Sequence, residues 1–104
     1  MFSLDDLART IALRAQASSE KSYTRSLLEQ GPRGAAKKFG EEAIEFVIAA
    51  VGQSDEALRA EAADVLYHML VVLEAREVSL GDVLSELERR TGRSGHEEKA
   101  ARAS

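Results

Sequence analysis

Two groups of carboxylates lie in otherwise apolar stretches of this chain. The first comprises Glu41, Glu42 and Glu45, and the second comprises Glu61 and Asp64. Residues three or four positions apart share one face of a helix, so each group can converge in space. If the two stretches form neighbouring antiparallel helices, all of these carboxylates can meet across one seam. Their mutual repulsion would be relieved by a cation between them, so the sequence predicts a metal site.

The available ligand atoms indicate which metal would bind. The chain has no cysteine, and both histidines lie outside the two groups, so the ligands are oxygens. Such ligands favour a hard divalent ion, and we expect Mg²⁺, with Mn²⁺ as a substitute. A di-iron bundle would carry histidine three residues after its glutamate, where this chain has Asp64.

The alternative to a metal site is an ordinary solvated helix face, where most helical carboxylates lie. The context of the carboxylates weakens that interpretation. Glu45 lies between Ile44 and Phe46, and no basic residue lies three or four positions from it. Glu61 and Asp64 bracket two alanines, which would let a helix or a ligand approach closely.

A basic segment precedes the first carboxylate group. It contains Arg33, Lys37 and Lys38, and Lys38 lies four residues before Glu42, on the same helical face. Lys38 can form an ordinary helix ion pair, or it can hold phosphate oxygens and stabilise charge in a transition state. Cations beside metal-binding carboxylates suit a metal-complexed phosphate ester.

Two further residues lie near the carboxylates with less defined roles. Glu41 points about 100 degrees away from Glu42 on a helix, so it can act as a ligand or orient one. His68 follows Asp64 by four residues in an apolar run. A lone histidine there is more often a hydrogen-bonded core residue than a ligand, although this position also permits support of a ligand.

Composition limits the class of protein. The chain of 104 residues fits one small domain, and its net charge of -4 argues against nucleic acid as the main partner. The absence of cysteine fits a reducing cytoplasm. The first residues lack the pattern of a signal peptide, and the apolar run over 65–73 is too short to span a bilayer. We therefore expect a cytoplasmic protein without a membrane segment.

The pattern of residues predicts an all-α bundle of about five helices. Ala, Leu, Glu and Arg dominate, β-branched residues do not alternate with polar ones, and only one proline is present. Serines at 3, 22, 54 and 79 are typical helix caps, and Gly31 with Pro32 should end the second helix. The expected helices span residues 3–17, 23–30, 34–51, 54–77 and 79–90. We expect one domain over 1–91 and a mobile tail over 92–104.

The two middle helices are apolar around most of their circumference. A helix with this pattern must be buried on most sides, and a chain of this length has few other helices to cover it. A symmetric homodimer that shares its helical core is the simplest solution.

The strings that flank the carboxylates are more specific than their spacing. They read SYT at 22–24, GP at 31–32, AKKFGEEAIE at 36–45, EAADVLYH at 61–68 and LSELERR at 84–90. Together they resemble the phosphoribosyl-ATP pyrophosphohydrolase family, within the superfamily of all-α nucleoside triphosphate pyrophosphatases. The resemblance covers about residues 22–90.

This resemblance implies Mg²⁺-dependent hydrolysis of phosphoribosyl-ATP to phosphoribosyl-AMP and pyrophosphate, the second step of histidine biosynthesis, by a cytoplasmic homodimer. It implies metal ligands at Glu42, Glu45, Glu61 and Asp64. It implies catalytic roles for Glu41, Glu42, Glu45 and Lys38. It implies substrate contacts at Ser22, Tyr23, Thr24, Lys37 and Lys38. Two alternatives stay open: a house-cleaning pyrophosphatase of the same fold that acts on other nucleotides, and a non-catalytic helical interaction module.

Overall fold

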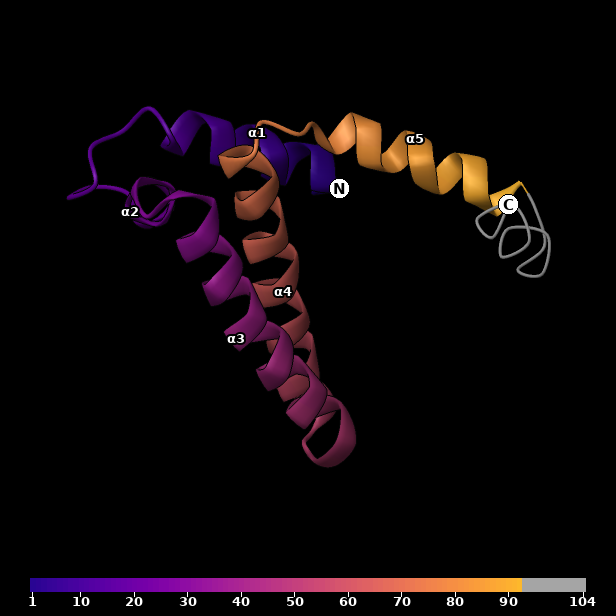
Figure 1. Ribbon diagram of the computed structural model, residues 1–104. Helices are drawn as coiled ribbons and strands as arrows, with labels where there is room; N and C mark the ends of the chain where they lie inside the picture. Colours follow the sequence, from indigo (N-terminus) through magenta and orange to yellow (C-terminus); the bar gives the residue numbers. More distant parts are fainter. Residues whose placement is uncertain (93–104) are drawn as a thin grey trace.

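The computed structural model describes residues 1–92, and within them the chain forms five helices and no strand (Figure 1). The helices are α1 (Leu4–Arg14), α2 (Tyr23–Glu29), α3 (Gly31–Gly52), α4 (Asp55–Ala75) and α5 (Leu80–Thr91). The predicted all-α class is confirmed. None of these helices combines the length and the apolar character that a membrane span requires. The predicted tail lies, apart from Gly92, outside the described residues.

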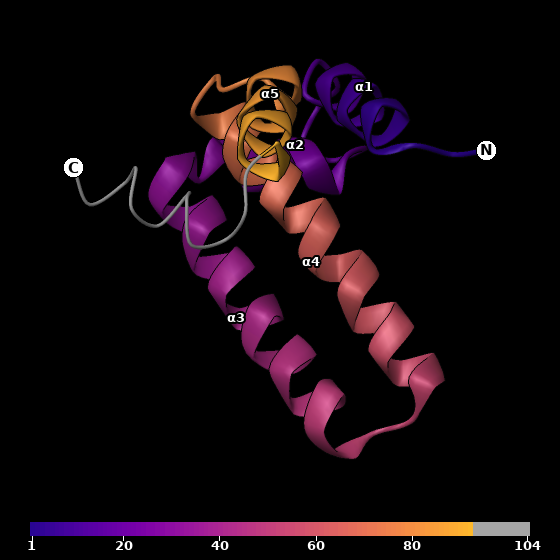
Figure 2. The ribbon, with the colours of Figure 1, turned by 90° about the vertical axis from the view of Figure 1, so that its right-hand side faces the viewer.

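Two long helices dominate the arrangement. α3 and α4 run side by side in opposite directions and are joined by a short link at Gln53 and Ser54 (Figures 1 and 2). α1 and α2 lie at the end of this hairpin that is opposite the link, and α5 extends away from it (Figure 1). The seam between α3 and α4 is therefore the part of the fold that can bring the two carboxylate groups together.

Serine caps fix the starts of four helices, as predicted. Ser3 and Asp6 form a reciprocal capping box, in which each side chain accepts a hydrogen bond of 3.0 Å from the other residue's backbone N–H. Ser22, Ser54 and Ser79 each accept a hydrogen bond of 3.1 Å from the backbone N–H three residues later. These bonds satisfy N–H groups that a helix start leaves without partners.

Two helix boundaries in the first third of the chain differ from the prediction. α1 ends at Arg14 rather than near Ala17, and α3 begins at Gly31 rather than near Gly34. Gly31 does end α2, but its φ of +76° turns the chain directly into α3. Pro32 then lies in the first turn of α3, where its missing N–H costs no helical hydrogen bond.

The end of α4 was also predicted too late in the chain. The helix ends at Ala75, and Glu77 adopts a left-handed conformation with a φ of +56°. The backbone N–H of Val78 donates to the carbonyl of Leu73 at 2.9 Å, and that of Glu77 donates to Glu74 at 3.1 Å. This is the hydrogen-bond pattern of a helix end that usually has glycine at the left-handed position. Because glutamate occupies that position here, the sequence contained no recognisable stop.

The hydrophobic core lies at the end of the hairpin that α1 and α2 cover. Its buried residues come from all five helices: Ile11, Leu27, Ala35, Leu70, Val71 and Leu80. Leu4, Leu7 and Ala8 pack against this cluster, so one face of α1 is turned toward the core. The core clamps one end of α3 against one end of α4, and this fixes the register of the two helices along their seam.

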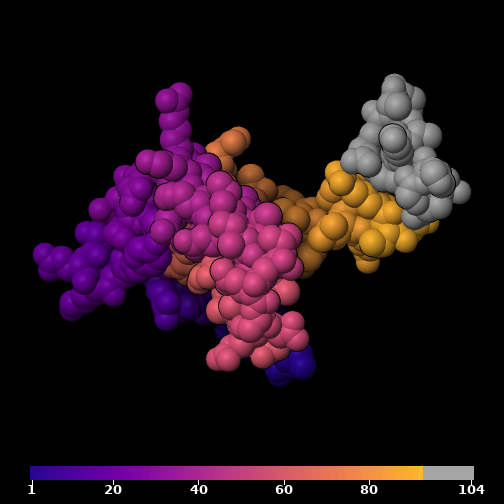
Figure 3. Space-filling view, turned by 90° about the horizontal axis from the view of Figure 1, so that it is seen from below, coloured from indigo at the N-terminus to yellow at the C-terminus, as the bar shows by residue number. Residues whose placement is uncertain are grey.

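The outer face of α3 carries an apolar stripe that the other described residues, within 1–92, leave exposed. It consists of Ile44, Val47, Ile48 and Val51, all of them exposed, with Val51 at 82%. Their spacing of three, four and seven residues places them on one side of the helix. The buried Ala49 shows that the opposite side faces the protein. In Figure 3, α3 forms much of the visible surface, while α5 projects away from it.

Candidate metal centre

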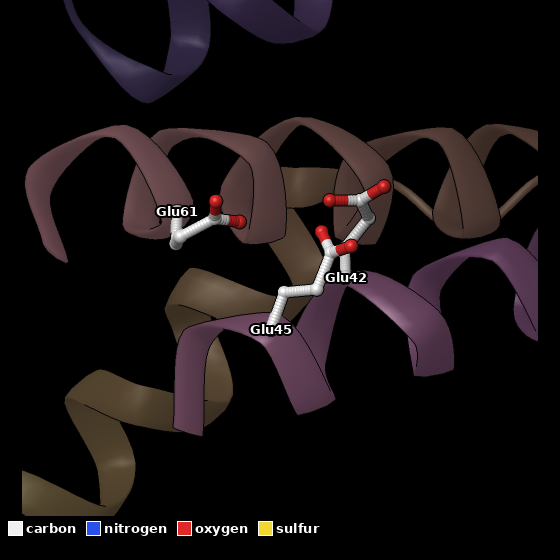
Figure 4. Close-up of side chains that lie close together, drawn as sticks. All are labelled: Glu42, Glu45 and Glu61. Atoms are coloured by element: carbon white, nitrogen blue, oxygen red, sulfur yellow. The ribbon is translucent and has the colours of Figure 1, made fainter. Parts of the chain in front are cut away.

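Three carboxylates meet at the seam between α3 and α4. Glu42 and Glu45 project from α3, and Glu61 projects from α4 toward them (Figure 4). One oxygen of each side chain lies within 4.8 Å of an oxygen of each of the others. Glu42 and Glu45 are one helical turn apart, so both can face the same partner helix.

The group is closed on one side and open on the other. Glu42 is buried, with 8% of its surface exposed, whereas Glu45 is exposed to solvent. Glu61 is partly buried, and its Oε2 atom is buried without a hydrogen-bond partner among the described residues. A buried carboxylate oxygen that lacks a donor is costly, so this atom has an unmet need for a cation or a donor.

The pKa values of these carboxyls reflect their crowding. The hydrogen bond from Lys38 is the main cause that holds the pKa of Glu42 below its usual range, and a hydrogen bond with Glu45 acts in the same direction. The pKa of Glu45 is raised, first by that bond and by the charge of Glu42, and then by the charge of Glu61. Two carboxylates this close cannot both ionise freely unless a positive charge joins them.

Asp64 and Glu41 stand outside the group of mutually close oxygens. Asp64 is exposed and lies about one turn from Glu61 on α4. Glu41 is exposed on α3, beside Glu42. Of the four residues predicted to bind the metal, the structure therefore brings Glu42, Glu45 and Glu61 together, and it places Asp64 nearby on the surface.

Lys38 adds a positive charge next to the carboxylates. Its Nζ atom lies 3.1 Å from Oε1 of Glu42, one turn further along α3. The pKa of Lys38 is raised, mainly by this hydrogen bond and next by the charge of Tyr23. Lys38 is thus a cation at neutral pH and lies near the Tyr23 hydroxyl as well as the carboxylates. Lys37, at the adjacent position, is exposed.

The three residues expected to face a substrate differ in their surroundings. Ser22 is buried and its hydroxyl caps α2. Thr24 is fully buried, and its hydroxyl forms a hydrogen bond of 2.6 Å with the hydroxyl of Tyr67. Tyr23 is exposed, so within this segment its side chain is the one open to a bound molecule.

Two residues of α4 join this region although the sequence assigned them no firm role. The ring of Tyr67 stacks on that of Tyr23, with centroids 6.3 Å apart. His68 is buried and lies edge-on to both tyrosine rings. His68 follows Glu61 by seven residues, two turns on the same helical face, and this spacing was the signal that could have linked them.

The residues present fit a hard divalent cation. Their donor atoms are carboxylate oxygens, and these oxygens are close enough to share one ion. One oxygen, Oε2 of Glu61, is buried without a hydrogen-bond partner among the described residues. Mg²⁺ and Mn²⁺ prefer such ligands. With Lys38 beside it, this arrangement can bind an anionic group that is itself complexed to the cation.

Comparisons with known proteins point to one family. The family model described as phosphoribosyl-ATP pyrophosphohydrolase matches residues 4–91. A phosphoribosyl-ATP pyrophosphatase of Agrobacterium fabrum is 56% identical over 101 residues, which are 97% of this chain and 94% of the relative. The corresponding protein of Paracoccus denitrificans is 57% identical over 99 residues, 95% of this chain and 92% of the relative. That of Rhodobacter capsulatus is 54% identical over 102 residues, 98% and 99% of the two chains.

Proposed function

Because this chain belongs to the phosphoribosyl-ATP pyrophosphohydrolase family, we propose that it hydrolyses phosphoribosyl-ATP to phosphoribosyl-AMP and pyrophosphate, the second step of histidine biosynthesis. The bond cleaved is the anhydride between the α and β phosphates. The observation that carries this proposal is the carboxylate group of Glu42, Glu45 and Glu61 beside Lys38, in a chain that matches the family over nearly its whole length. We further propose that the enzyme acts in the cytoplasm.

We propose that the cation is Mg²⁺, with Mn²⁺ as a substitute. Glu42, Glu45 and Glu61 would hold it, and Asp64, about one turn from Glu61, would supply a fourth carboxylate. When bound, the ion supplies neutralisation of phosphate charge and a more acidic water. The support for this assignment is the close set of carboxylate oxygens and the partnerless Oε2 of Glu61.

The remaining predicted residues divide into those that touch the substrate and those that support it. Lys38 is proposed to hold phosphate oxygens and to stabilise the charge that develops on the pyrophosphate. Tyr23 and Lys37 are exposed and can contact the nucleotide, while Ser22 and Thr24 hold α2 in place through their buried hydroxyls. Glu41 is proposed to act beside Glu42 from the solvent side of the site.

An assay of pyrophosphate release from phosphoribosyl-ATP tests the proposed function. We expect turnover with millimolar Mg²⁺, loss of turnover in excess chelator and recovery when Mg²⁺ or Mn²⁺ is restored. The carboxylates and the triphosphate are both anionic, so a cation is needed to neutralise their charge. Turnover of canonical or modified deoxynucleoside triphosphates without turnover of phosphoribosyl-ATP would instead support a house-cleaning enzyme. No Mg²⁺-induced rise in melting temperature, together with no activity on either substrate class, would support an interaction module.

We also propose that the protein functions as a homodimer in which the apolar stripe of α3 is buried. The stripe consists of the exposed side chains Ile44, Val47, Ile48 and Val51. A continuous apolar stripe of this kind on a helix is uncommon on a monomer and is typical of an interface. A second copy of the same face can cover it in a symmetric arrangement, and this would also bury more apolar surface for a small domain.

The substitution Ile48→Glu tests this interface. It places a charge in the middle of the stripe. We expect the dimer dissociation constant to rise at least about tenfold, which corresponds to a loss of about 1.4 kcal/mol of dimerisation free energy. The matched control is Ala50→Glu, which adds the same charge at an exposed position of α3 outside the stripe. Light scattering across a concentration series measures both variants. A wild-type protein that stays monomeric at high concentration, or an Ile48→Glu variant that dimerises normally, contradicts the proposal.

A further inference from the structure

His68 is a buried polar residue that the proposed chemistry leaves unused. Only 5% of its surface is exposed. The rings of Tyr23 and Tyr67 lie edge-on to its imidazole, with centroids 6.2 and 4.9 Å away. These contacts fix the plane of the imidazole, so its two nitrogens point in defined directions.

The hydrogen bond of the Nδ1 atom determines which nitrogen carries the proton. Nδ1 lies 2.7 Å from the backbone carbonyl oxygen of Asp64. A carbonyl oxygen can only accept, so Nδ1 must be the donor and must carry a hydrogen. In the neutral ring, Nε2 is therefore a bare acceptor.

The Nε2 atom is buried and has no hydrogen-bond partner among the described residues. It belongs to the carboxylate site by position, because His68 follows Glu61 by two helical turns on the same face of α4 and lies near enough to Glu42 to influence that carboxyl electrostatically. Neither ring nitrogen belongs to the set of mutually close donor atoms formed by Glu42, Glu45 and Glu61. His68 thus lies beside the proposed metal ligands rather than among them.

Within the part of the chain that the structure describes, no donor reaches Nε2. A buried acceptor that lacks a donor costs free energy, and a water molecule is the smallest group that can supply one. Mg²⁺ bound by carboxylates usually keeps several of its waters, so the loaded site would contain such donors.

We propose that His68 is a positioning residue whose Nε2 accepts a hydrogen bond from a water molecule held between α3 and α4 beside Glu42. This inference rests on the proposed function, because the water belongs to the hydration of the cation. Its consequence is that His68 orients one water on the buried side of the site, while the exposed side near Glu45 stays open to the substrate.

Two substitutions separate the nitrogens of His68. An asparagine side chain places its amide near the position of Nδ1, so His68→Asn can keep the bond to the Asp64 carbonyl but has no group at Nε2. A glutamine side chain reaches the position of Nε2, so His68→Gln can present an acceptor there. We expect His68→Asn to bind Mn²⁺ about 10-fold more weakly than wild type, and His68→Gln to recover most of that loss.

Calorimetric titration of the substrate-free protein with Mn²⁺ measures these affinities without any need for activity, and circular dichroism checks that each variant is folded. Wild-type affinity in His68→Asn, or equal losses in both variants, would overturn the inference while leaving the proposed function intact. If the wild type itself binds no Mn²⁺, both the metal assignment and this inference fail.

A crystal structure of the wild-type protein with Mn²⁺ decides the question if His68→Asn does not fold. We expect a water oxygen within about 3.2 Å of Nε2. Direct coordination of the ion by Nε2, or a dry contact with protein atoms, would overturn the proposal.

Discussion

Glu45→Gln is expected to raise the thermal stability of the metal-free protein and to lower its activity at least about 100-fold. The two effects have one cause, the crowding of Glu45 against Glu42 and Glu61. Without a cation, the ionised Glu45 repels both neighbours, and glutamine removes that repulsion while keeping the shape of the side chain. With a cation, the same substitution removes a metal ligand. Removal of a residue that only supports a ligand typically lowers metal affinity or activity roughly 10- to 100-fold. Loss of the ligand itself should lower activity more, so about 100-fold is a lower bound.

The shifted pKa values of Glu45 and Glu42 also determine how the stability of the metal-free protein changes with pH. The folded protein raises the pKa of Glu45 above its usual value of 4.5, so the folded state binds this proton more tightly than the unfolded state does. The metal-free wild type should therefore lose stability at this residue as the pH rises from 4.5 through the raised pKa. Glu42 acts in the opposite direction. Its lowered pKa gives a contribution that is present above 4.5 and is lost as the pH falls through the lowered value.

Thermal unfolding at pH 7, in chelator and in millimolar Mg²⁺, measures the prediction for Glu45→Gln. The wild type should gain stability from Mg²⁺, and the variant should start higher and gain little. Glu88→Gln is the matched control, because it makes the same chemical change at an exposed position of α5, away from the seam. A variant that is less stable than wild type in chelator, or one that keeps its activity, would contradict the role assigned to Glu45.

Lys38→Met is expected to lower kcat about 100-fold while leaving the affinity for Mg²⁺ unchanged or higher. Lys38 lies 3.1 Å from Glu42, so it competes with a cation for that carboxylate in the free enzyme. Its proposed contribution appears when negative charge develops on the pyrophosphate, and a donor of this kind is worth about 100-fold or more in rate. Methionine keeps the aliphatic part of the side chain and removes the charge.

The alternative role of Lys38 as an ordinary helix ion pair predicts a different result. Removal of such a pair costs a few tenths of a kcal/mol of stability and leaves kcat almost unchanged. Steady-state kinetics with phosphoribosyl-ATP and calorimetry with Mn²⁺ distinguish the two roles. Arg14→Met removes the same charge from the exposed end of α1 and serves as the control. A value of kcat for Lys38→Met close to that of the control would reduce Lys38 to a structural role.

Local interactions made much of the fold predictable. The serine caps at 3, 22, 54 and 79 depend on residues three positions apart, and each appears where expected. The end of α4 escaped prediction because Glu77 adopts a left-handed conformation that its residue type disfavours, within the local hydrogen-bond pattern of a helix end that usually has glycine there. The hydrogen bond between Thr24 and Tyr67 joins residues 43 positions apart, so no local pattern could reveal it.

The candidate site was predictable to the level of helix faces but not of the register between helices. Spacing of three grouped Glu61 with Asp64, whereas the seam with α3 follows the face that contains Glu61 and His68. Which residues of α4 oppose Glu42 and Glu45 depends on the link at Gln53 and Ser54 and on the core that clamps the other end of the hairpin. These are features of tertiary structure, and they leave Asp64 exposed one turn from Glu61 while His68 is buried.

The position of the carboxylates on a single helical hairpin also has a consequence for folding kinetics. Glu42, Glu45 and Glu61 are close in sequence, so they meet as soon as α3 packs on α4, before distant contacts such as that of Thr24 with Tyr67 need to form. Their repulsion then acts early, on the rate at which the hairpin forms. A divalent cation present during refolding should accelerate this step, because it would relieve the repulsion between the carboxylates while α3 packs on α4. The ion would then assist folding as well as catalysis.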